Sequence, residues 1–184
     1  MSEKEKMLNG DYYNPMDIEL RDERFKAKTL CYEYNKLAPI DELKRIDLIE
    51  CIFNRKVYNC KIEPNFFCDY GYNIEIKDNF YSNHNLVLLD ANKIIFGSNV
   101  FVGPNCGFYT PIHPFEKDKR NKGLEKALPI IVEDNVWIGG NVTVLAGVTI
   151  GENSVIGAGS VVTKDIPKNS VAVGNPCKVI RRNK

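Results

Sequence analysis

His113 is the residue of this sequence best suited to proton-transfer chemistry, and it is one of only two histidines. An unperturbed imidazole has a pKa of about 6.5, so histidine accepts and releases a proton near neutral pH. Pro114 follows His113 directly, and a residue before proline is restricted to extended conformations. His113 is therefore our candidate general base, with Glu125 of the same segment as the carboxylate that orients its ring.

The other reactive side chains do not form a recognisable site. The cysteines show neither a CxxC pair nor the spacing of a metal site, so we expect free thiols and no metal. No serine or cysteine stands in the setting of a nucleophile. We interpret His84, between Asn83 and Asn85, as a structural or peripheral residue. The six cysteines are Cys31, Cys51, Cys60, Cys68, Cys106 and Cys177.

The charge of the chain is balanced, with 25 Lys and Arg against 24 Asp and Glu. A net charge of +1 gives no general field for nucleic acid or membranes. The C-terminal run VGNPCKVIRRNK is the exception, and its basic residues suit either a solvated tail or an anion site. The N-terminus lacks the apolar core of a signal peptide and no apolar run is long enough to span a membrane, so we expect a cytoplasmic protein.

A six-residue repeat sets the elements that must position these side chains. One run consists of Ile130, Val136, Val142, Val148, Ser154, Ser160 and Ile166. An earlier run in another phase consists of Ile62, Cys68, Ile74, Phe80 and Leu86, with Leu88, Ile94, Val100 and Cys106 two places on. A period of six fits neither a helix nor an alternating strand. It is typical of a parallel β-helix, in which each unit is a short strand and a turn and three units close one triangular coil.

The repeat also predicts the size of this domain and the residues at its corners. At about 18 residues per coil, residues 57–108 form about three coils and residues 128–166 about two, which makes a column about 24 Å tall. Gly139, Gly151 and Gly157 are expected at corners, where glycine reaches positive φ without steric cost. The alternative is an antiparallel sandwich, which predicts turns every 8 to 12 residues, roughly, instead of every six.

Residues 1–55 lack the repeat and are predicted to form a small helical cap. Asp17 is the expected N-cap of a helix from Ile18 to Tyr34, and Asp41 the expected N-cap of a second helix. The apolar residues of the second helix fall on one stripe, which we expect to pack on the β-helix. These residues are Leu43, Ile46, Ile49 and Phe53.

The repeat is interrupted once, at about residues 108–128, where His113 and Glu125 lie. This segment has no strand pattern, and a long loop inside a compact domain is usually functional or disordered. We expect an ordered base and a mobile tip. The β-helix then covers residues 56–166, with the loop inside it and a basic segment at residues 167–184 after it.

Several runs of this sequence resemble the maltose and galactoside O-acetyltransferases, a family of hexapeptide-repeat enzymes. The resemblance covers nearly the whole chain, from the region of the helical cap to the C-terminal segment. The runs that carry it are GDYYNPMDIEL, TLCYEYN, YGYNIEI, NFYSNHNLVLLD, the His113-Pro114 pair, NVWIGGNVTVLAGVTIGENSVIGAGSVVTKDIP and GNPCKVIR.

The resemblance implies a left-handed parallel β-helix, all-β apart from the cap, although crossover connections are usually right-handed. It implies a homotrimer with active sites between subunits and transfer of an acetyl group from acetyl-CoA to a sugar hydroxyl. His113 matches the catalytic histidine, and the acceptor side takes Asp69, Asn83, Asp17 and Tyr81. Coenzyme A would contact Trp137, Gly139, Gly157, Ala158, Thr163, Lys164, Lys178 and Arg181.

Three departures from the galactoside enzymes resemble the maltose branch instead, and they leave the sugar unnamed. They are Asp69 in place of a serine, Ala91 in place of an acidic residue and Lys178 in place of an arginine. We expect direct transfer in a ternary complex to a maltose or glucose type of acceptor, with backbone amides near Gly139 and Gly140 stabilising the oxyanion.

Other functions stay open on the sequence alone. A second hypothesis within the same family of folds is an acyltransferase that acts on serine, an antibiotic or an amino sugar. A third is a trimeric β-helix that binds or assembles without catalysis, which has no need of a loop histidine. A zinc-dependent carbonic anhydrase built on a β-helix needs three histidine ligands, and this chain has two histidines in total.

Overall fold

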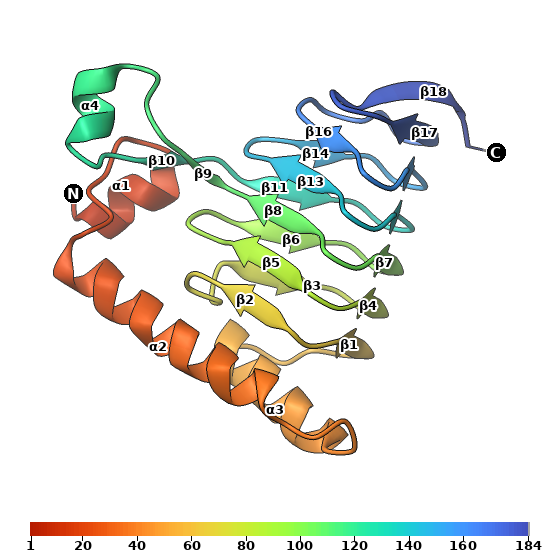
Figure 1. The fold of residues 1–184 in the computed structure, drawn as a ribbon, viewed down its shortest axis with the longest axis horizontal. Coiled ribbons are helices and arrows are strands. Elements are labelled where there is room, and N and C mark those ends of the chain that lie inside the picture. The colour runs from red at the N-terminus through yellow and green to blue at the C-terminus, as the bar shows by residue number, and fades with distance from the viewer. Residues whose placement is uncertain (184) are drawn as a thin grey trace.

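The computed structural model describes residues 1–183 of the 184, and its main body is a triangular prism of three parallel sheets (Figure 1). The first sheet contains β1 (Cys60–Ile62), β4 (Phe80–Ser82), β7 (Val100–Val102), β12 (Trp137–Ile138), β15 (Val155–Ile156) and β17 (Ser170–Val173), to which β18 (Lys178–Arg182) adds antiparallel. The second contains β2 (Phe66–Cys68), β5 (Leu86–Leu89), β8 (Gly107–Tyr109), β13 (Thr143–Leu145) and β16 (Val161–Val162). The third contains β3 (Ile74–Ile76), β6 (Ile94–Phe96), β11 (Ile130–Val132) and β14 (Thr149–Ile150).

The side chains of the six-residue repeat fill the prism, which confirms the predicted β-helix. Ile74, Ile94 and Ile130 are fully buried and stack in register through β3, β6 and β11. Phe96 contacts both Phe80 and Phe108 across the prism, at ring-centroid distances of 4.9 and 5.1 Å. The column is therefore a continuous apolar core with neighbouring coils one strand spacing apart.

The phase change of the repeat arises at one edge of the prism, between the second and third sheets. We call this the variable edge. From strand start to strand start it takes eight residues in the first two coils, Phe66 to Ile74 and Leu86 to Ile94, and 23 residues from Gly107 to Ile130. It takes six from Thr143 to Thr149.

The edge between the first and second sheets varies far less, and we call it the constant edge. Its steps are six residues in every coil except the third, where Val100 to Gly107 takes seven. The long loop is thus the extreme case of a variation that recurs on one edge only.

The expectation of positive φ at Gly139, Gly151 and Gly157 is wrong. Most left-handed corner positions are held by asparagines, among them Asn85 and Asn105 with φ of 64° and 58°, and others by glycines such as Gly147 and Gly159. Asparagine tolerates this conformation, and here its side chain also bonds to the next coil, as in Asn85 Nδ2 to Asn105 Oδ1 at 2.9 Å.

The glycines serve close approach between coils. A Cβ on Gly139 would lie 2.6 Å from the backbone nitrogen of Ala158, and a Cβ on Gly151 would lie 2.5 Å from that of Lys168. A Cβ on Gly157 would lie 2.6 Å from Cγ1 of Val173. These positions therefore exclude side chains for packing reasons.

The N-terminal cap consists of three helices: α1 (Glu3–Asn9), α2 (Ile18–Asn35) and α3 (Glu42–Phe53). Helices α2 and α3 close the first-coil end of the prism, whereas α1 lies beside β10 (Lys126–Ala127) at the base of the long loop (Figure 1). Asp17 caps α2 as predicted, with its carboxylate accepting from the backbone of Glu19 at 3.1 Å. The sequence analysis missed α1, although Ser2 and Glu5 form a capping box that signals it.

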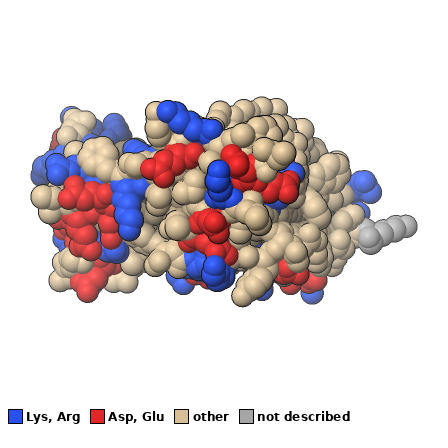
Figure 2. Space-filling view, turned by 90° about the horizontal axis from the view of Figure 1, so that it is seen from below, with Lys and Arg blue, Asp and Glu red and all other residues tan. Residues whose placement is uncertain are grey.

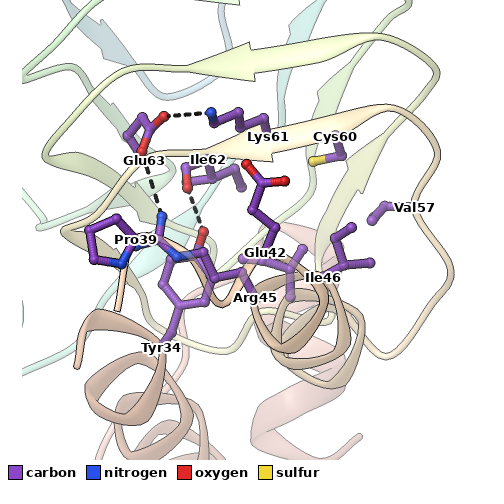
Figure 3. A pocket seen from close by; sticks show the side chains of 11 residues that line it. Tyr34, Pro39, Glu42, Arg45, Ile46, Val57, Cys60, Lys61, Ile62 and Glu63 are labelled. Atoms are coloured by element: carbon purple, nitrogen blue, oxygen red, sulfur yellow. Dashed lines mark hydrogen bonds and ion pairs between the residues drawn. The ribbon is translucent and has the colours of Figure 1, made fainter. Parts of the chain in front are cut away.

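The predicted apolar stripe of α3 is correct only in its second half. Ile49 and Phe53 are buried, whereas Leu43 is 78% exposed and Ile46 40% exposed. Ile46 lines a cavity of about 280 Å³ between α3 and β1, which accounts for its exposure (Figure 3), whereas Leu43 does not line that cavity. Asp41 occupies the N-cap position without a side-chain capping bond.

Polar contacts around this cavity help to fasten the cap to the first coil (Figure 3). Tyr34 donates its hydroxyl hydrogen to the carbonyl oxygen of Ile62 at 2.5 Å, and Arg45 lies 3.6 Å from Glu63. Lys61 pairs with the same glutamate at 3.1 Å. Beside them the ring of Phe66 packs edge-on against Tyr34.

The loop between β8 and β11 forms an antiparallel ribbon at its base and a short helix at its tip. The ribbon joins β9 (Pro111–Ile112) to β10 (Lys126–Ala127), and the helix is α4 (Lys117–Asn121). The base is ordered as expected, but the expected absence of strands is wrong, because two residues on each side pair. Two-residue strands are too short to leave a pattern in the sequence.

The surface charge and the hydropathy of the helices do not change this description of the fold. The view from below shows basic and acidic side chains side by side, in keeping with the balanced composition (Figure 2). Within residues 1–183 no helix is long and apolar enough to cross a membrane. The cysteines are free, and Cys51 is exposed.

Candidate active site

His113 follows β9 directly, so the ribbon at the base of the loop fixes its backbone. Its side chain is 61% exposed, and its Nε2 lies 3.8 Å from Oε1 of Glu125, which precedes β10 on the opposite side of the ribbon. The structure therefore brings the two predicted catalytic residues together. A distance of 3.8 Å is an ion-pair distance, and catalytic hydrogen bonds are often this long before substrate binds.

Glu125 is held in turn by Tyr13 of the segment before α2. The Tyr13 hydroxyl donates to Oε2 of Glu125 at 2.8 Å. The two backbones also pair in both directions, with N–H to carbonyl distances of 2.8 and 3.1 Å. Burial, followed by the charge of Glu125, raises the pKa of Tyr13, so its hydroxyl keeps the hydrogen that it donates to Glu125. The sequence analysis gave Tyr13 no role, because no periodicity links residues 112 positions apart.

Asp69 lies directly after β2, on the same variable edge as His113. Burial raises the pKa of Asp69, Lys28 and Arg24 lower it, and the charge of Glu125 raises it further. Its neighbour Tyr70 accepts a hydrogen bond from Arg24 at 2.7 Å. Asp69 and Glu125 therefore contribute to one partly desolvated acidic environment beside the exposed imidazole.

Asp90, which the sequence analysis did not single out, supports the turn that carries Asp69. One carboxylate oxygen, Oδ1, accepts from the backbone N–H groups of Asp69 and Tyr70 at 3.0 and 2.8 Å. The other oxygen has no partner within the described residues. Burial raises the pKa of Asp90 to about 7. Asp90 thus holds the acceptor-side turn through a largely desolvated carboxyl group.

The remaining acceptor residues do not join this cluster in a single chain. Tyr81 lies on β4 and Asn83 directly after it, and both line a groove on the first sheet together with Trp137 of β12. Trp137 is 58% exposed. Asp17 is occupied as the N-cap of α2. His113 is not among the residues that line the groove.

The residues expected to bind coenzyme A lie in the last coils. Gly139, Gly157 and the exposed Ala158 follow first-sheet strands at the constant edge, where both glycines are also required by the packing of the next coil. Thr163 and Lys164 are exposed at the variable edge after β16. Lys178 and Arg181 lie exposed on β18.

One expected oxyanion donor is already occupied. The N–H of Gly139 donates to the carbonyl oxygen of Ile156 at 2.8 Å, which is part of the bonding between coils. The N–H of Gly140 donates to no group within residues 1–183. Of the two amides, only that of Gly140 is free to act on a ligand. In the same range, no group of three or more His, Cys, Asp or Glu side chains is placed to hold a metal ion.

Two family models match this chain. Residues 6–56 match the maltose acetyltransferase hexapeptide capping motif, and residues 129–164 match the bacterial transferase hexapeptide of six repeats. Among curated relatives, a predicted acetyltransferase of Saccharomyces cerevisiae is 51% identical over 97% of this chain and 91% of its own length. A predicted acetyltransferase of Staphylococcus aureus (strain MRSA252) is 52% identical over 99% of this chain and 92% of its own.

Solved structures of acetyltransferases share the whole fold. A maltose O-acetyltransferase from Clostridium difficile 630 has a TM-score of 0.94 at 45% identity, covering 100% of this chain and 98% of the other. A galactoside acetyltransferase in complex with coenzyme A has a TM-score of 0.96 at 42% identity, covering 100% and 92%. A hexapeptide-repeat acetyltransferase from Vibrio cholerae O1 biovar eltor, complexed with acetyl-CoA, has a TM-score of 0.92 at 38% identity and covers both chains completely.

Proposed function

Because this chain belongs to the maltose and galactoside O-acetyltransferase family of hexapeptide-repeat enzymes, we propose that it acetylates a hydroxyl of a maltose or glucose type of sugar with acetyl-CoA as the donor. The observation that carries this proposal is the exposed imidazole of His113 beside the carboxylate of Glu125. An exposed histidine backed by a carboxylate suits a general base, whereas a purely structural loop needs neither.

His113 acts as the base in a direct transfer. A sugar hydroxyl is a weak nucleophile at neutral pH, so the ring nitrogen that Glu125 does not face takes its proton while the oxygen attacks the thioester carbon. The tetrahedral intermediate collapses with cleavage of the C–S bond, and protonated His113 returns the proton to the leaving thiolate. Glu125 stabilises the imidazolium formed in between.

The oxyanion of the intermediate is stabilised by backbone donors. The N–H of Gly140 is the candidate, because the N–H of Gly139 is engaged by Ile156. Loss of one oxyanion-hole donor typically costs roughly 3 kcal/mol of transition-state stabilisation. No residue of the cluster is placed as a covalent nucleophile, in keeping with a ternary complex.

The acceptor and cofactor sites are shared between copies in this proposal. The His113, Glu125 and Asp69 cluster lies at the variable edge, whereas the Tyr81, Asn83 and Trp137 groove lies on the first sheet. A three-fold trimer would place the variable edge of one subunit opposite the first sheet of the next. The exposed Trp137 would then line the acetyl pocket, and the hydroxyl-binding residues would face it.

Coenzyme A runs along the later coils in the same arrangement. The small, exposed side chain of Ala158 suits the close approach of the pantetheine arm, and the cations of Lys164, Lys178 and Arg181 suit the phosphates. The reduced cysteines and the use of acetyl-CoA fit a cytoplasmic enzyme.

An acceptor panel tests this function. The purified protein is incubated with acetyl-CoA and maltose, glucose, a galactoside, serine or an amino sugar, and thiol release is measured. We expect the highest kcat/KM with the glucose-type sugars. His113→Ala should keep the fold and lose at least about 100-fold in kcat. Faster thiol release with serine or the amino sugar would contradict the proposed acceptor class. Unchanged thiol release by His113→Ala would contradict the proposal that His113 is the general base.

A further inference from the structure

We propose that Tyr13 is a positioning residue of the reaction, which orients Glu125 toward His113 through its buried hydroxyl. The inference rests on the proposed function, because it assigns a role within the same site. It extends that site from the loop to the N-terminal cap, where the one residue expected at the site, Asp17, is engaged as the N-cap of α2.

The first argument is the geometry of the Glu125 carboxylate. Oε2 accepts from the Tyr13 hydroxyl at 2.8 Å, and Oε1 faces Nε2 of His113 at 3.8 Å. The two oxygens thus have different partners on opposite sides. A carboxylate held by one oxygen can turn only about that bond, so the hydroxyl of Tyr13 decides where the other oxygen lies.

The second argument is the rigidity of Tyr13 itself. Its side chain is 1% exposed, and it packs in an apolar cluster with Met7, Leu20, Tyr70 and Ala127. Its backbone is paired with that of Glu125 in both directions. The hydroxyl is therefore delivered from a fixed platform, while the imidazole that it serves indirectly is 61% exposed and needs orientation.

The third argument is that the Tyr13 hydroxyl is the donor that holds Oε2 of Glu125. The groups that face Glu125 come from three other parts of the fold: His113 after β9, Tyr13 before α2, and Asp69 with Tyr70 after β2. Arg24 donates to the Tyr70 hydroxyl, and so it does not compete for the glutamate. Burial raises the pKa of Tyr13, which keeps the donor in place throughout the working pH range.

Tyr13→Phe removes the hydroxyl and keeps the ring, the packing and the backbone pairing. We expect kcat/KM for acetyl transfer to fall between about 3- and 30-fold, because a hydrogen bond to a charged group is lost and only part of its effect reaches His113. We also expect the acidic limb of the pH profile of kcat/KM to move to lower pH. The negative charge of Glu125 favours the protonated form of His113 when the two side chains are close. In Tyr13→Phe the carboxylate is held less well, so this effect is weaker.

The matched control is Tyr12→Phe. Tyr12 is the adjacent tyrosine and is 43% exposed; its ring lies over the Lys119 ammonium at 5.2 Å, a contact that phenylalanine preserves. This variant should retain the wild-type kcat/KM and pH profile. Glu125→Gln sets the opposite limit, and the pH limb of Tyr13→Phe should fall between those of the wild type and Glu125→Gln.

The outcomes separate this inference from the proposed function. If His113→Ala and Glu125→Gln lose activity while Tyr13→Phe matches the wild type in kcat/KM and in its pH limb, the role of Tyr13 is overturned and the function stands. A lower melting temperature with unchanged kinetics would assign Tyr13 to stability alone, which also overturns it. If His113→Ala itself retains full activity, the failure lies with the proposed function.

Discussion

The constant and variable edges flank the same sheet, yet they differ in almost every respect. At the constant edge the steps between strands are six or seven residues, and glycines bring successive backbones so close that a Cβ would overlap the next coil. At the variable edge the steps range from six to 23 residues, and turns there carry Asp69, His113 and Glu125. The comparison teaches that this solenoid confines its irregularity, and with it the side chains that we propose to react, to one edge.

The two edges depend on each other for function, because neither holds the whole candidate site. The variable edge supplies the proposed base, His113, and the carboxylates around it. The constant edge and the first sheet supply a groove with Trp137 and Asn83, and the small residues suited to a cofactor. The following experiments test whether one edge is purely architectural and whether the other is the source of the chemistry.

The largest effect is expected from a side chain at the constant edge. Gly103→Val should lower the free energy of unfolding by about 4 kcal/mol or more, because even a Cβ would lie 2.5 Å from the backbone nitrogen of Gly140. Urea denaturation measures this loss. Gly123→Ala in the loop is the control, where the added Cβ meets nothing within 4 Å and only the left-handed φ of 74° costs about 1 kcal/mol.

Equal costs at the two glycines would contradict the distinction between the edges. A tolerated valine at position 103 would mean that neighbouring coils can separate, and that the constant edge is less rigid than its glycines indicate.

The next effect concerns the sharing of one site between subunits. His113→Ala and Asn83→Ala should each be nearly inactive, but co-assembly of the two variants should restore about a quarter of the wild-type activity. In random trimers that fraction of interfaces combines an intact His113 with an intact Asn83. Thiol release is measured before and after subunit exchange. A mixture no more active than the average of the separate variants would place both residues in one chain's site.

The next effect is a dependence of stability on pH, which we expect from Asp90, the buried carboxyl group of the variable edge. Burial raises the pKa of Asp90 to about 7, above the value of about 3.9 in an unfolded chain. Between these values the folded protein holds a proton that the unfolded chain has lost, so the free energy of unfolding falls as pH rises, by up to about 1.4 kcal/mol per unit. Asp90→Asn should remove this fall.

Urea denaturation at pH 4.5, 6 and 8 measures the difference between Asp90→Asn and the wild type. The free energy of unfolding of Asp90→Asn, relative to that of the wild type, should rise from pH 4.5 to pH 8. Above pH 8 this difference should stay constant. A difference that does not change with pH would show that Asp90 titrates as an ordinary carboxyl group.

The smallest effect is expected at a left-handed corner. Asn105→Ala should cost about 1 to 2 kcal/mol, because alanine is strained at a φ of 58° and the bond from Asn85 is lost. Asn105→Gly is the matched variant, which relieves the strain and loses only the bond. Thermal unfolding measures the stability of both variants. If the alanine variant is as stable as the glycine variant, backbone strain at this position does not contribute to the loss.

The sequence alone predicts most of the β-helical column, but it predicts few of the contacts that hold the candidate site in place. The six-residue repeat places buried residues such as Ile94 and Val144 inside the prism because the periodicity of the fold is the periodicity of the sequence. The corners were less predictable. Asparagine and glycine both suit turns, and only the stacking of coils decides which of them takes a positive φ, as Asn105 does, and which makes room for the next coil, as Gly139 does for Ala158.

The pairing of His113 with Glu125 was within reach of the sequence, because both lie in one interrupted segment. The contributions of Tyr13 and Asp90 were not. Each acts through contacts that depend on where the cap and the neighbouring coil come to lie, and such contacts leave no local pattern. The exposed first turn of α3 was missed for the same reason, since the cavity beside it is a property of packing.

The bridge between Tyr13 and Glu125 also has a consequence for the order in which this protein folds. Neighbouring coils join residues about one turn of the solenoid apart, so the column can grow by short-range steps. The bridge closes a loop of 112 residues. During synthesis Tyr13 leaves the ribosome long before its partner, and the loop cannot be fixed until the third coil exists. His113, the proposed base, therefore acquires its final surroundings late, after most of the scaffold has assembled.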